Sequence, residues 1–216
     1  QIAKAIIAMP HAPAEKIREI VALLNANDLE HDILPSFALS LKSGASVLSL
    51  RHVQIEDLLG RDAVDLNAEN IRRMVEGKTL LVTGAGGSIG SELCRQIAQF
   101  QPAHLVMLDR DESALHALQL SLDGRGLLQD PGLVLADIRD YERLDEIFTA
   151  HRPQVVFHAA ALKHLTMLQR FPEEGLKTNV IGTDNVLRVA CANGVAIFVN
   201  ISTDKAADPS SVLGET

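Results

Sequence analysis

From residue 78 onward, the hydrophobic pattern of the chain switches regularly between two periods. Short runs of β-branched and aliphatic residues predict buried strands near residues 79–83, 104–109, 132–136, 154–159 and 195–201. Between these runs, apolar residues return every three or four positions, which predicts helices near residues 88–100, 111–122, 140–151 and 172–193. Strands that alternate with helices at this spacing form a doubly wound parallel sheet, so the predicted fold class is α/β of the Rossmann type.

Residues 1–77 have a different pattern. Residues 1–50 are expected to form a smaller, partial α/β domain, which starts so close to a strand that its beginning is expected to be missing. Its predicted elements are a strand over Ala5–Met9, a helix over Ala14–Asn25 and a strand over His31–Leu34. Residues 51–77 are polar and alternate in charge, which predicts a connector with one short helix, capped by Asn67 and followed by Gly77. Residues 78–216 then form the main domain.

The stretch from Lys78 to Gly90 joins a predicted strand, a glycine-rich turn and a predicted helix. This order is typical of the unit that binds a dinucleotide. We expect Gly84 to allow the tight turn, Gly87 to leave room for a pyrophosphate, and Gly90 to let the helix pack close to the sheet. The first N–H groups of the helix would then face the phosphates. A glycine-rich turn without a ligand is the alternative, but Asp109 ends the next strand 25 positions after Gly84, which favours a dinucleotide.

The ends of the next predicted strands carry candidate cofactor contacts. Asp109 is placed to accept hydrogen bonds from the adenosine ribose and to repel a 2′-phosphate, which favours NAD over NADP. The adjacent Arg110 could instead receive that phosphate. Asp137 ends the third strand, where the adenine would lie, whereas Asp140 is the more natural cap of the following helix. His158 and the three alanines after it end the fourth strand and would let the backbone approach a cofactor, although a plain buried strand end is the alternative.

Composition narrows the classes of function. The 216 residues are 47% hydrophobic but only 3% aromatic, and the formal net charge is −8. Without a Lys/Arg cluster, and with few aromatic residues to stack on bases, nucleic-acid binding is not expected. No apolar run reaches ~18 residues and no signal peptide is recognisable, so no membrane span is expected in this chain and a cytoplasmic location is predicted. Cys94 and Cys191 have no metal-ligand companions, so both are expected to be buried and reduced and no metal is predicted.

Several motifs of the chain resemble those of the extended short-chain dehydrogenases/reductases. The matching positions are Thr83-Gly84-x-x-Gly87-x-x-Gly90, Asp109, Asp137, His158-Ala159-Ala160 and Thr178-Asn179-Val-x-Gly182-Thr183. With Ser202-Thr203-Asp204-Lys205-Ala206 and Ala161-x-Lys163-His164, residues 78–216 are similar to the CapD-like nucleotide-sugar 4,6-dehydratases of polysaccharide and glycan biosynthesis. Residues 1–77 also resemble the cytoplasmic α/β domain that precedes the catalytic domain in the long, membrane-anchored members of that family.

This resemblance implies an NAD cofactor and a UDP-N-acetylhexosamine substrate. The implied cofactor contacts are Thr83, Gly84, Gly86, Gly87, Ser88, Ile89, Gly90, Asp109, Arg110, Asp137, Ile138, His158, Ala159, Ala160, Lys163 and Asn179. In the implied reaction, Thr203 hydrogen-bonds the sugar 4-oxygen, Asp204 protonates the leaving C6 hydroxyl, and Lys205 removes the C5 proton. These roles would require partial burial of Asp204, and burial or a nearby positive charge at Lys205. An Asp–Lys pair that only decorates a surface loop is the alternative.

The chain departs from the wider superfamily at the usual Tyr-x-x-x-Lys pair. The tyrosine position is Leu213, and the lysine would follow Thr216, the last residue. We therefore expect a chain truncated at both ends that binds cofactor but does not turn over alone, from a parent anchored at the cytoplasmic face of the inner membrane. A homo-oligomer is compatible with the family. Two other functions stay open: a nucleotide-sugar 4-epimerase, which needs no C5 base, and a non-catalytic nucleotide-binding module, which only Leu213 and the missing lysine favour.

Overall fold

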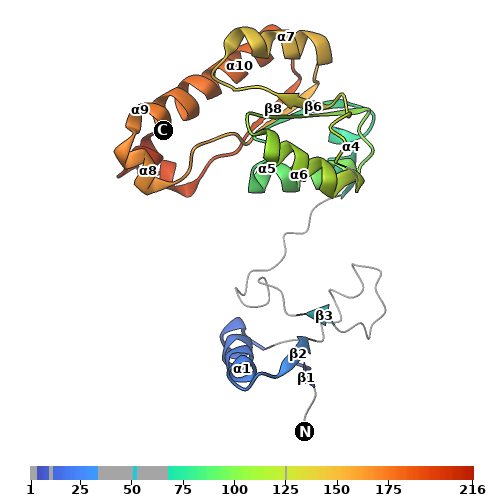
Figure 1. Ribbon diagram of the computed structural model, residues 1–216, viewed down its shortest axis with the longest axis vertical. Coiled ribbons are helices and arrows are strands. Elements are labelled where there is room, and N and C mark those ends of the chain that lie inside the picture. Colours follow the sequence, from blue (N-terminus) through green and yellow to red (C-terminus); the bar gives the residue numbers. More distant parts are fainter. Residues whose placement is uncertain (1–3, 10–11, 34–50, 53–67, 125) are drawn as a thin grey trace. The chain divides into compact units, whose positions relative to one another are not determined.

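The computed structural model describes residues 4–9, 12–33, 51–52, 68–124 and 126–216, and the chain divides into two compact units between residues 66 and 67 (Figure 1). In the first unit, strand β1 (Lys4–Ile7) pairs in parallel with β2 (Glu30–Ile33), and β3 (Arg51–His52) pairs with β2 in the antiparallel direction. Helix α1 (Ala14–Ala26) packs Ile17 against Ile7 and Ile33. The predicted strand–helix–strand order is therefore present, with Leu34 outside the described residues.

The second unit contains a five-stranded parallel sheet with the strand order β6-β5-β4-β7-β8. Its strands are β4 (Thr79–Thr83), β5 (His104–Asp109), β6 (Leu133–Leu135), β7 (Val155–His158) and β8 (Ile197–Asn200). The order of the strands reverses at β4, because β5 and β6 lie on one side of it and β7 and β8 on the other. This is the doubly wound Rossmann arrangement, and the predicted fold class is confirmed.

Helices cover both faces of this sheet (Figure 1). The main ones are α5 (Ser88–Ala98), α6 (Glu112–Asp123), α7 (Tyr141–His151) and α10 (Thr183–Ala192). Successive residues of a strand point to opposite faces. Leu80 and Val82 of β4 therefore pack with α5 and α6, whereas Leu81 packs with α7 and α10. Each face of the sheet therefore has its own hydrophobic core. The two cores hold the strands in the sheet, so that their carboxyl ends lie side by side along one edge.

The short helix α4 (Ala68–Val75) was predicted as part of a connector, but it belongs to the second unit. Its last residue, Val75, is buried in the same core as Leu80. Gly77 follows the helix with φ +66°, a left-handed conformation that suits glycine at this position. The predicted cap, Asn67, lies outside the described residues.

The single helix predicted for residues 172–193 is wrong in its interior. The structure has α9 (Pro172–Gly175), then a π-helix, η1 (Leu176–Gly182), and then α10. The hydrophobic pattern did not reveal the wider π-helical turn, because apolar residues three or four positions apart predict a helix without specifying which carbonyl each N–H bonds. Helix α8 (Leu165–Arg170), which was not predicted, precedes this segment, and β8 is followed by the 3₁₀ turn η2 (Asp204–Ala206) and by α11 (Val212–Glu215).

The two cysteines differ in their surroundings. Cys94 is buried in α5, and this burial raises the pKa of its thiol to about 12. Cys191 is exposed, so its predicted burial is wrong, because it lies one position past the buried face of α10 formed by Val186, Val189 and Ala190. Among the described residues, no helix is long and apolar enough to cross a membrane.

Candidate functional site

A cleft of about 900 Å³ runs along the carboxyl ends of the strands in the second unit. This edge of a doubly wound sheet is where ligands bind, at the point where the strand order reverses. All the predicted cofactor residues line the cleft except Thr83 and Gly86. Two of the three predicted catalytic residues, Thr203 and Lys205, also line it, and Asp204 does not. The fold thus brings the predicted residues together from six separate segments of the sequence.

The glycine turn after β4 has the shape of a phosphate cradle. Gly84 has φ +64°, and a Cβ atom there would lie 2.7 Å from the backbone of Ala160. Gly87 is the N-cap of α5, and a Cβ atom there would meet only the carbonyl oxygen of Gly84, at 3.2 Å. No side chain in the described part of the chain caps α5, and its first turn carries no acidic residue. The positive end of the helix therefore faces the cleft with no acidic residue in its own first turn.

Gly90 has a different role from the predicted one. A Cβ atom at Gly90 would overlap the carbonyl oxygen of Gly84, so this glycine lets α5 pack on the turn rather than on the sheet. Gly86 is equally constrained, because a Cβ atom there would overlap the methyl group of Ala114.

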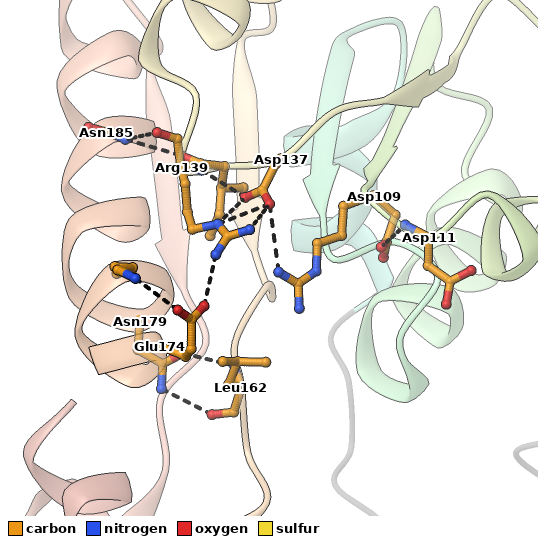
Figure 2. A network of polar contacts seen from close by, with 11 residues as sticks. Asp109, Asp111, Asp137, Arg139, Leu162, Glu174, Asn179 and Asn185 are labelled. Carbon is orange, nitrogen blue, oxygen red and sulfur yellow. Dashed lines mark hydrogen bonds and ion pairs between the residues drawn. The ribbon is translucent and has the colours of Figure 1, made fainter. Parts of the chain in front are cut away.

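Asp109 is tied to the glycine turn through its carboxylate. Its Oδ2 accepts a hydrogen bond from the Gly86 N–H at 2.8 Å. Its Oδ1 accepts one from the Asp111 N–H at 3.0 Å (Figure 2). Each oxygen keeps a second acceptor position, which leaves the carboxylate able to accept from ribose hydroxyls. Gly86, predicted as a cofactor contact, thus fixes the position of the residue expected to recognise the ribose.

Thr83 and His158 form a buried polar pair that joins three elements. His158 Nδ1 lies 2.7 Å from Thr83 Oγ1, and His158 Nε2 lies 2.9 Å from Thr183 Oγ1. Thr83 Oγ1 also accepts from the Ala159 N–H at 3.2 Å. A neutral ring that accepts at Nδ1 and donates at Nε2 satisfies both hydroxyls. Burial lowers the pKa of His158 to about 4, so the ring stays neutral and braces the floor of the cleft.

Because His158 is buried as a neutral ring, we expect the folded protein to lose stability in mild acid. The unfolded chain binds a proton at His158 near pH 6.5, whereas the folded protein binds it only near pH 4, so the free energy of unfolding should fall as the pH drops through this interval. The full contribution is about 3 kcal/mol, at 1.36 kcal/mol for each unit of pKa difference. Urea unfolding at pH 7, 5.5 and 4.5 measures it. His158→Gln should flatten this pH dependence, and an equally steep dependence in that variant would contradict the assignment.

Asp137 lies at the centre of a charge network at one end of the cleft (Figure 2). Its carboxylate accepts from Arg139, which also donates to Glu174 at 3.0 Å. Partial burial by itself would raise the pKa of Asp137, but the hydrogen bonds and charge of Arg139, with a smaller effect of Arg110, outweigh it and lower the pKa. Asp137 is therefore a carboxylate at neutral pH. The predicted cap, Asp140, accepts from the Arg143 N–H at 3.0 Å and begins α7, which confirms that prediction.

Two asparagines hold the helical wall of the cleft in place. Asn179 of η1 exchanges hydrogen bonds with the backbone of Leu162, at 2.8 and 3.0 Å. Asn185 of α10 is buried and donates to the carbonyl oxygens of Ile138 and Arg139, both at 3.2 Å. Asn185, Arg139 and Glu174 were not predicted as site residues from the sequence. The one available signal was Asn185 itself, a polar residue on the apolar face of a predicted helix.

The predicted catalytic segment follows β8. Thr203 caps η2, where its Oγ1 accepts from the Lys205 N–H and donates to Asp204 Oδ1 at 3.0 Å. Asp204 and Lys205 are both exposed, so the partial burial expected for Asp204 is not found. Of the two conditions expected for Lys205, burial is not found, and a nearby positive charge from a bound nicotinamide stays a prediction. Leu213 also lines the cleft, and a Cβ atom at the adjacent Gly214 would contact the Lys205 carbonyl oxygen, so α11 lies directly against the turn.

Comparisons with known proteins agree with this geometry. A profile of the family described as "Polysaccharide biosynthesis protein" matches residues 80–216. The capsular polysaccharide biosynthesis protein CapD of Staphylococcus aureus is 39% identical over 219 residues, which cover 100% of this chain and 36% of CapD. The chain thus spans little more than a third of the length of that relative.

Two solved structures have the same fold as the second unit. DesIV, a dTDP-glucose 4,6-dehydratase from Streptomyces venezuelae with NAD bound, is 29% identical with a TM-score of 0.55, and the match covers 63% of this chain and 47% of DesIV. A UDP-glucose 4-epimerase from Stenotrophomonas maltophila, with NAD and formylated UDP-arabinopyranose bound, is 27% identical with a TM-score of 0.55. That match covers 64% of this chain and 45% of the epimerase.

Proposed function

The chain belongs to the polysaccharide biosynthesis protein family, and on that premise we propose that it is the cofactor-binding part of an NAD-dependent nucleotide-sugar 4,6-dehydratase. The observation that carries the proposal is the single cleft that joins the glycine cradle, Asp109 and the Thr203–Lys205 turn. The cradle suits a pyrophosphate because the start of α5 is open at Gly87, whereas Cβ atoms at Gly84 or Gly90 would collide with the backbone and distort the turn. The substrate that we propose is a UDP-N-acetylhexosamine, in line with the resemblance to CapD-like enzymes and with neighbours that bind nucleotide sugars.

Each residue of the Thr203–Lys205 turn has a chemical role in this proposal. When bound, NAD supplies the hydride acceptor and donor that the reaction needs. Thr203 hydrogen-bonds the 4-oxygen of the sugar. As the hydride leaves C4, the proton of the 4-hydroxyl passes to a base other than Asp204 or Lys205, because Leu213 stands where the superfamily usually has a tyrosine. Lys205 removes the C5 proton, and Asp204 gives a proton to the C6 hydroxyl as it leaves as water. Because both charged side chains are exposed and Asp204 does not line the cleft, these roles require the bound nucleotide sugar, or further chain, to cover the turn.

An epimerase is the nearest competing function. One of the solved structures with the same fold is a UDP-glucose 4-epimerase, but an epimerase needs no C5 base and gives no role to the consecutive Asp204 and Lys205. A non-catalytic nucleotide-binding module would use the glycine cradle alone. Analysis of the product by NMR, with the full-length protein and UDP-N-acetylhexosamines, separates the three functions: a 4-keto-6-deoxy sugar, a C4 epimer, or binding without turnover.

We also propose that the full-length protein is anchored at the cytoplasmic face of the inner membrane. The support is the likeness of residues 1–77 to the domain that precedes the catalytic domain in membrane-anchored members. Fractionation of cells that produce the full-length protein tests this location, and recovery of all the protein in the soluble fraction would contradict it.

The cofactor can be tested directly by calorimetric titration. We expect the protein to bind NAD more tightly than NADP, because the Asp109 carboxylate accepts from the ribose hydroxyls and repels a 2′-phosphate. Asp109→Ala should weaken NAD binding by roughly 10- to 150-fold, the loss that corresponds to about 1.5–3 kcal/mol for hydrogen bonds to a charged group, and should narrow the preference over NADP. Asp111→Asn removes a nearby charge but keeps a capping oxygen for α6, and should bind as the wild type does. Tighter binding of NADP by the wild type would contradict the proposal.

A further inference from the structure

Arg139 occupies nearly all the hydrogen-bond acceptor positions of the Asp137 carboxylate. Its Oδ1 accepts from the backbone N–H of Arg139 at 3.0 Å and from Arg139 Nε at 3.1 Å. Its Oδ2 accepts from Arg139 Nε at 3.0 Å and from Arg139 Nη2 at 2.7 Å. A carboxylate offers about four acceptor positions. Asp137 is therefore poorly placed to recognise an adenine amino group, the role that its position at the end of β6 suggested.

Arg139 is itself held from two sides, which fixes the Asp137 carboxylate in space. Its Nη1 donates to Glu174 Oε2 at 3.0 Å, and Glu174 Oε1 accepts from Lys177 Nζ at 2.9 Å. Asn185 holds the backbone carbonyl of Arg139 (Figure 2). The network thus reaches from the end of β6 to α9 and η1. The negative charge of Asp137 cannot move away from the cleft without breaking these contacts.

Arg110 is the loosely held member of the network. Its Nη1 lies 3.6 Å from Asp137 Oδ2, close enough for an ion pair but too far for a hydrogen bond. Its side chain is 47% exposed, it lines the cleft, and it follows Asp109 directly. In the part of the chain that the structure describes, Asp137 is its one ion-pair partner. A 2′-phosphate on the ribose beside Asp109 would be within the reach of this guanidinium, which suits phosphate well.

We infer that Asp137 is a specificity-determining residue that acts through Arg110. Its fixed carboxylate holds Arg110 toward β6 and neutralises it, so that Arg110 does not offer a site for the 2′-phosphate of NADP. The preference for NAD then has two parts: repulsion of the phosphate by Asp109, and occupation of the arginine by Asp137. This inference rests on the proposed function, because it concerns how the proposed cofactor site distinguishes two dinucleotides.

The test is the ratio of the dissociation constants for NADP and NAD, measured by calorimetry at low salt. Asp137→Asn keeps the shape of the side chain and an oxygen for the Arg139 N–H, but removes the charge that holds Arg110. We expect the ratio to fall about three- to tenfold, as for the loss of a partly exposed ion pair. Arg110→Met added to Asp137→Asn should restore the wild-type ratio. Glu142→Gln removes one negative charge from the first turn of α7 and should leave the ratio unchanged.

A second variant keeps the inference testable if Asp137→Asn does not fold. Arg110→Met alone should change the ratio less than about twofold, because a neutralised arginine contributes little to phosphate binding. A large loss of NADP binding in that variant would show that Arg110 is already a phosphate site and would overturn the inference. An unchanged ratio in a folded Asp137→Asn protein that binds NAD would overturn it as well. If the wild type binds neither dinucleotide, the proposed function fails, and the inference fails with it.

Discussion

Gly87→Val is expected to abolish NAD binding and to leave the fold intact. Gly87 has φ −71° and ψ 168°, a conformation that any L-residue can adopt. A Cβ atom there would meet only the Gly84 carbonyl oxygen at 3.2 Å, so the small adjustment needed is local. The branched side chain would instead occupy the space above the start of α5, where the pyrophosphate must approach the backbone N–H groups. The loss should exceed the range of a calorimetric titration, whereas circular dichroism should match the wild type.

Gly90→Ala is the matched comparison for this prediction. Even a methyl group at Gly90 would overlap the Gly84 carbonyl oxygen, so this smaller change should lower the thermal midpoint of unfolding, which Gly87→Val should not. The two variants thus separate loss of the ligand site from loss of the turn. Normal NAD binding by Gly87→Val would mean that the phosphates lie elsewhere in the cleft.

The second large effect is expected at Lys205 in the full-length protein. Lys205→Ala removes the proposed C5 base, and loss of one acid or base typically costs ~10²–10⁴ in rate. Hydride removal from C4 does not need this base in the proposed scheme. The variant should therefore still form NADH when the nucleotide sugar is added, but should not exchange deuterium from solvent into C5. Absorbance of NADH and mass spectrometry of the recovered sugar measure the two steps.

Asp204→Asn should stop the same reaction at a later point. The base is intact, so deuterium should still enter C5, but the C6 hydroxyl should not leave because its proton donor is missing. Asp208→Asn, a change of the same kind at an exposed position four residues on, should turn over normally. Normal turnover of both Lys205→Ala and Asp204→Asn would assign the Asp–Lys pair a structural role, and the dehydratase proposal would lose its support from this turn.

The sequence predicted the parallel sheet and most of the cleft because both depend on local signals. Each strand is a short aliphatic run, and the glycines of the cradle are required by contacts within the turn itself, such as that between Gly90 and the Gly84 carbonyl. Helix α4 was misassigned because the burial of Val75 depends on a core built by distant segments. In the network around Asp137, the contact between Arg139 and Glu174 joins positions 35 residues apart, so no local pattern could reveal it. The exposure of Lys205 likewise depends on what covers the turn, which spacing does not encode.

Because of the π-helix η1, the packing of α10 depends on the number of residues in this segment as much as on their identity. Asn179 must reach Leu162, and Asn185, six positions later, must reach the backbone of Ile138 and Arg139. A π-helical turn corresponds to one residue inserted into an α-helix. Removal of one residue between 176 and 182 would rotate all of α10 by about 100° relative to α9. Val186 and Val189 would turn out of the core, and Asn185 would leave the cleft wall, so single-residue deletions should be tolerated far less here than substitutions.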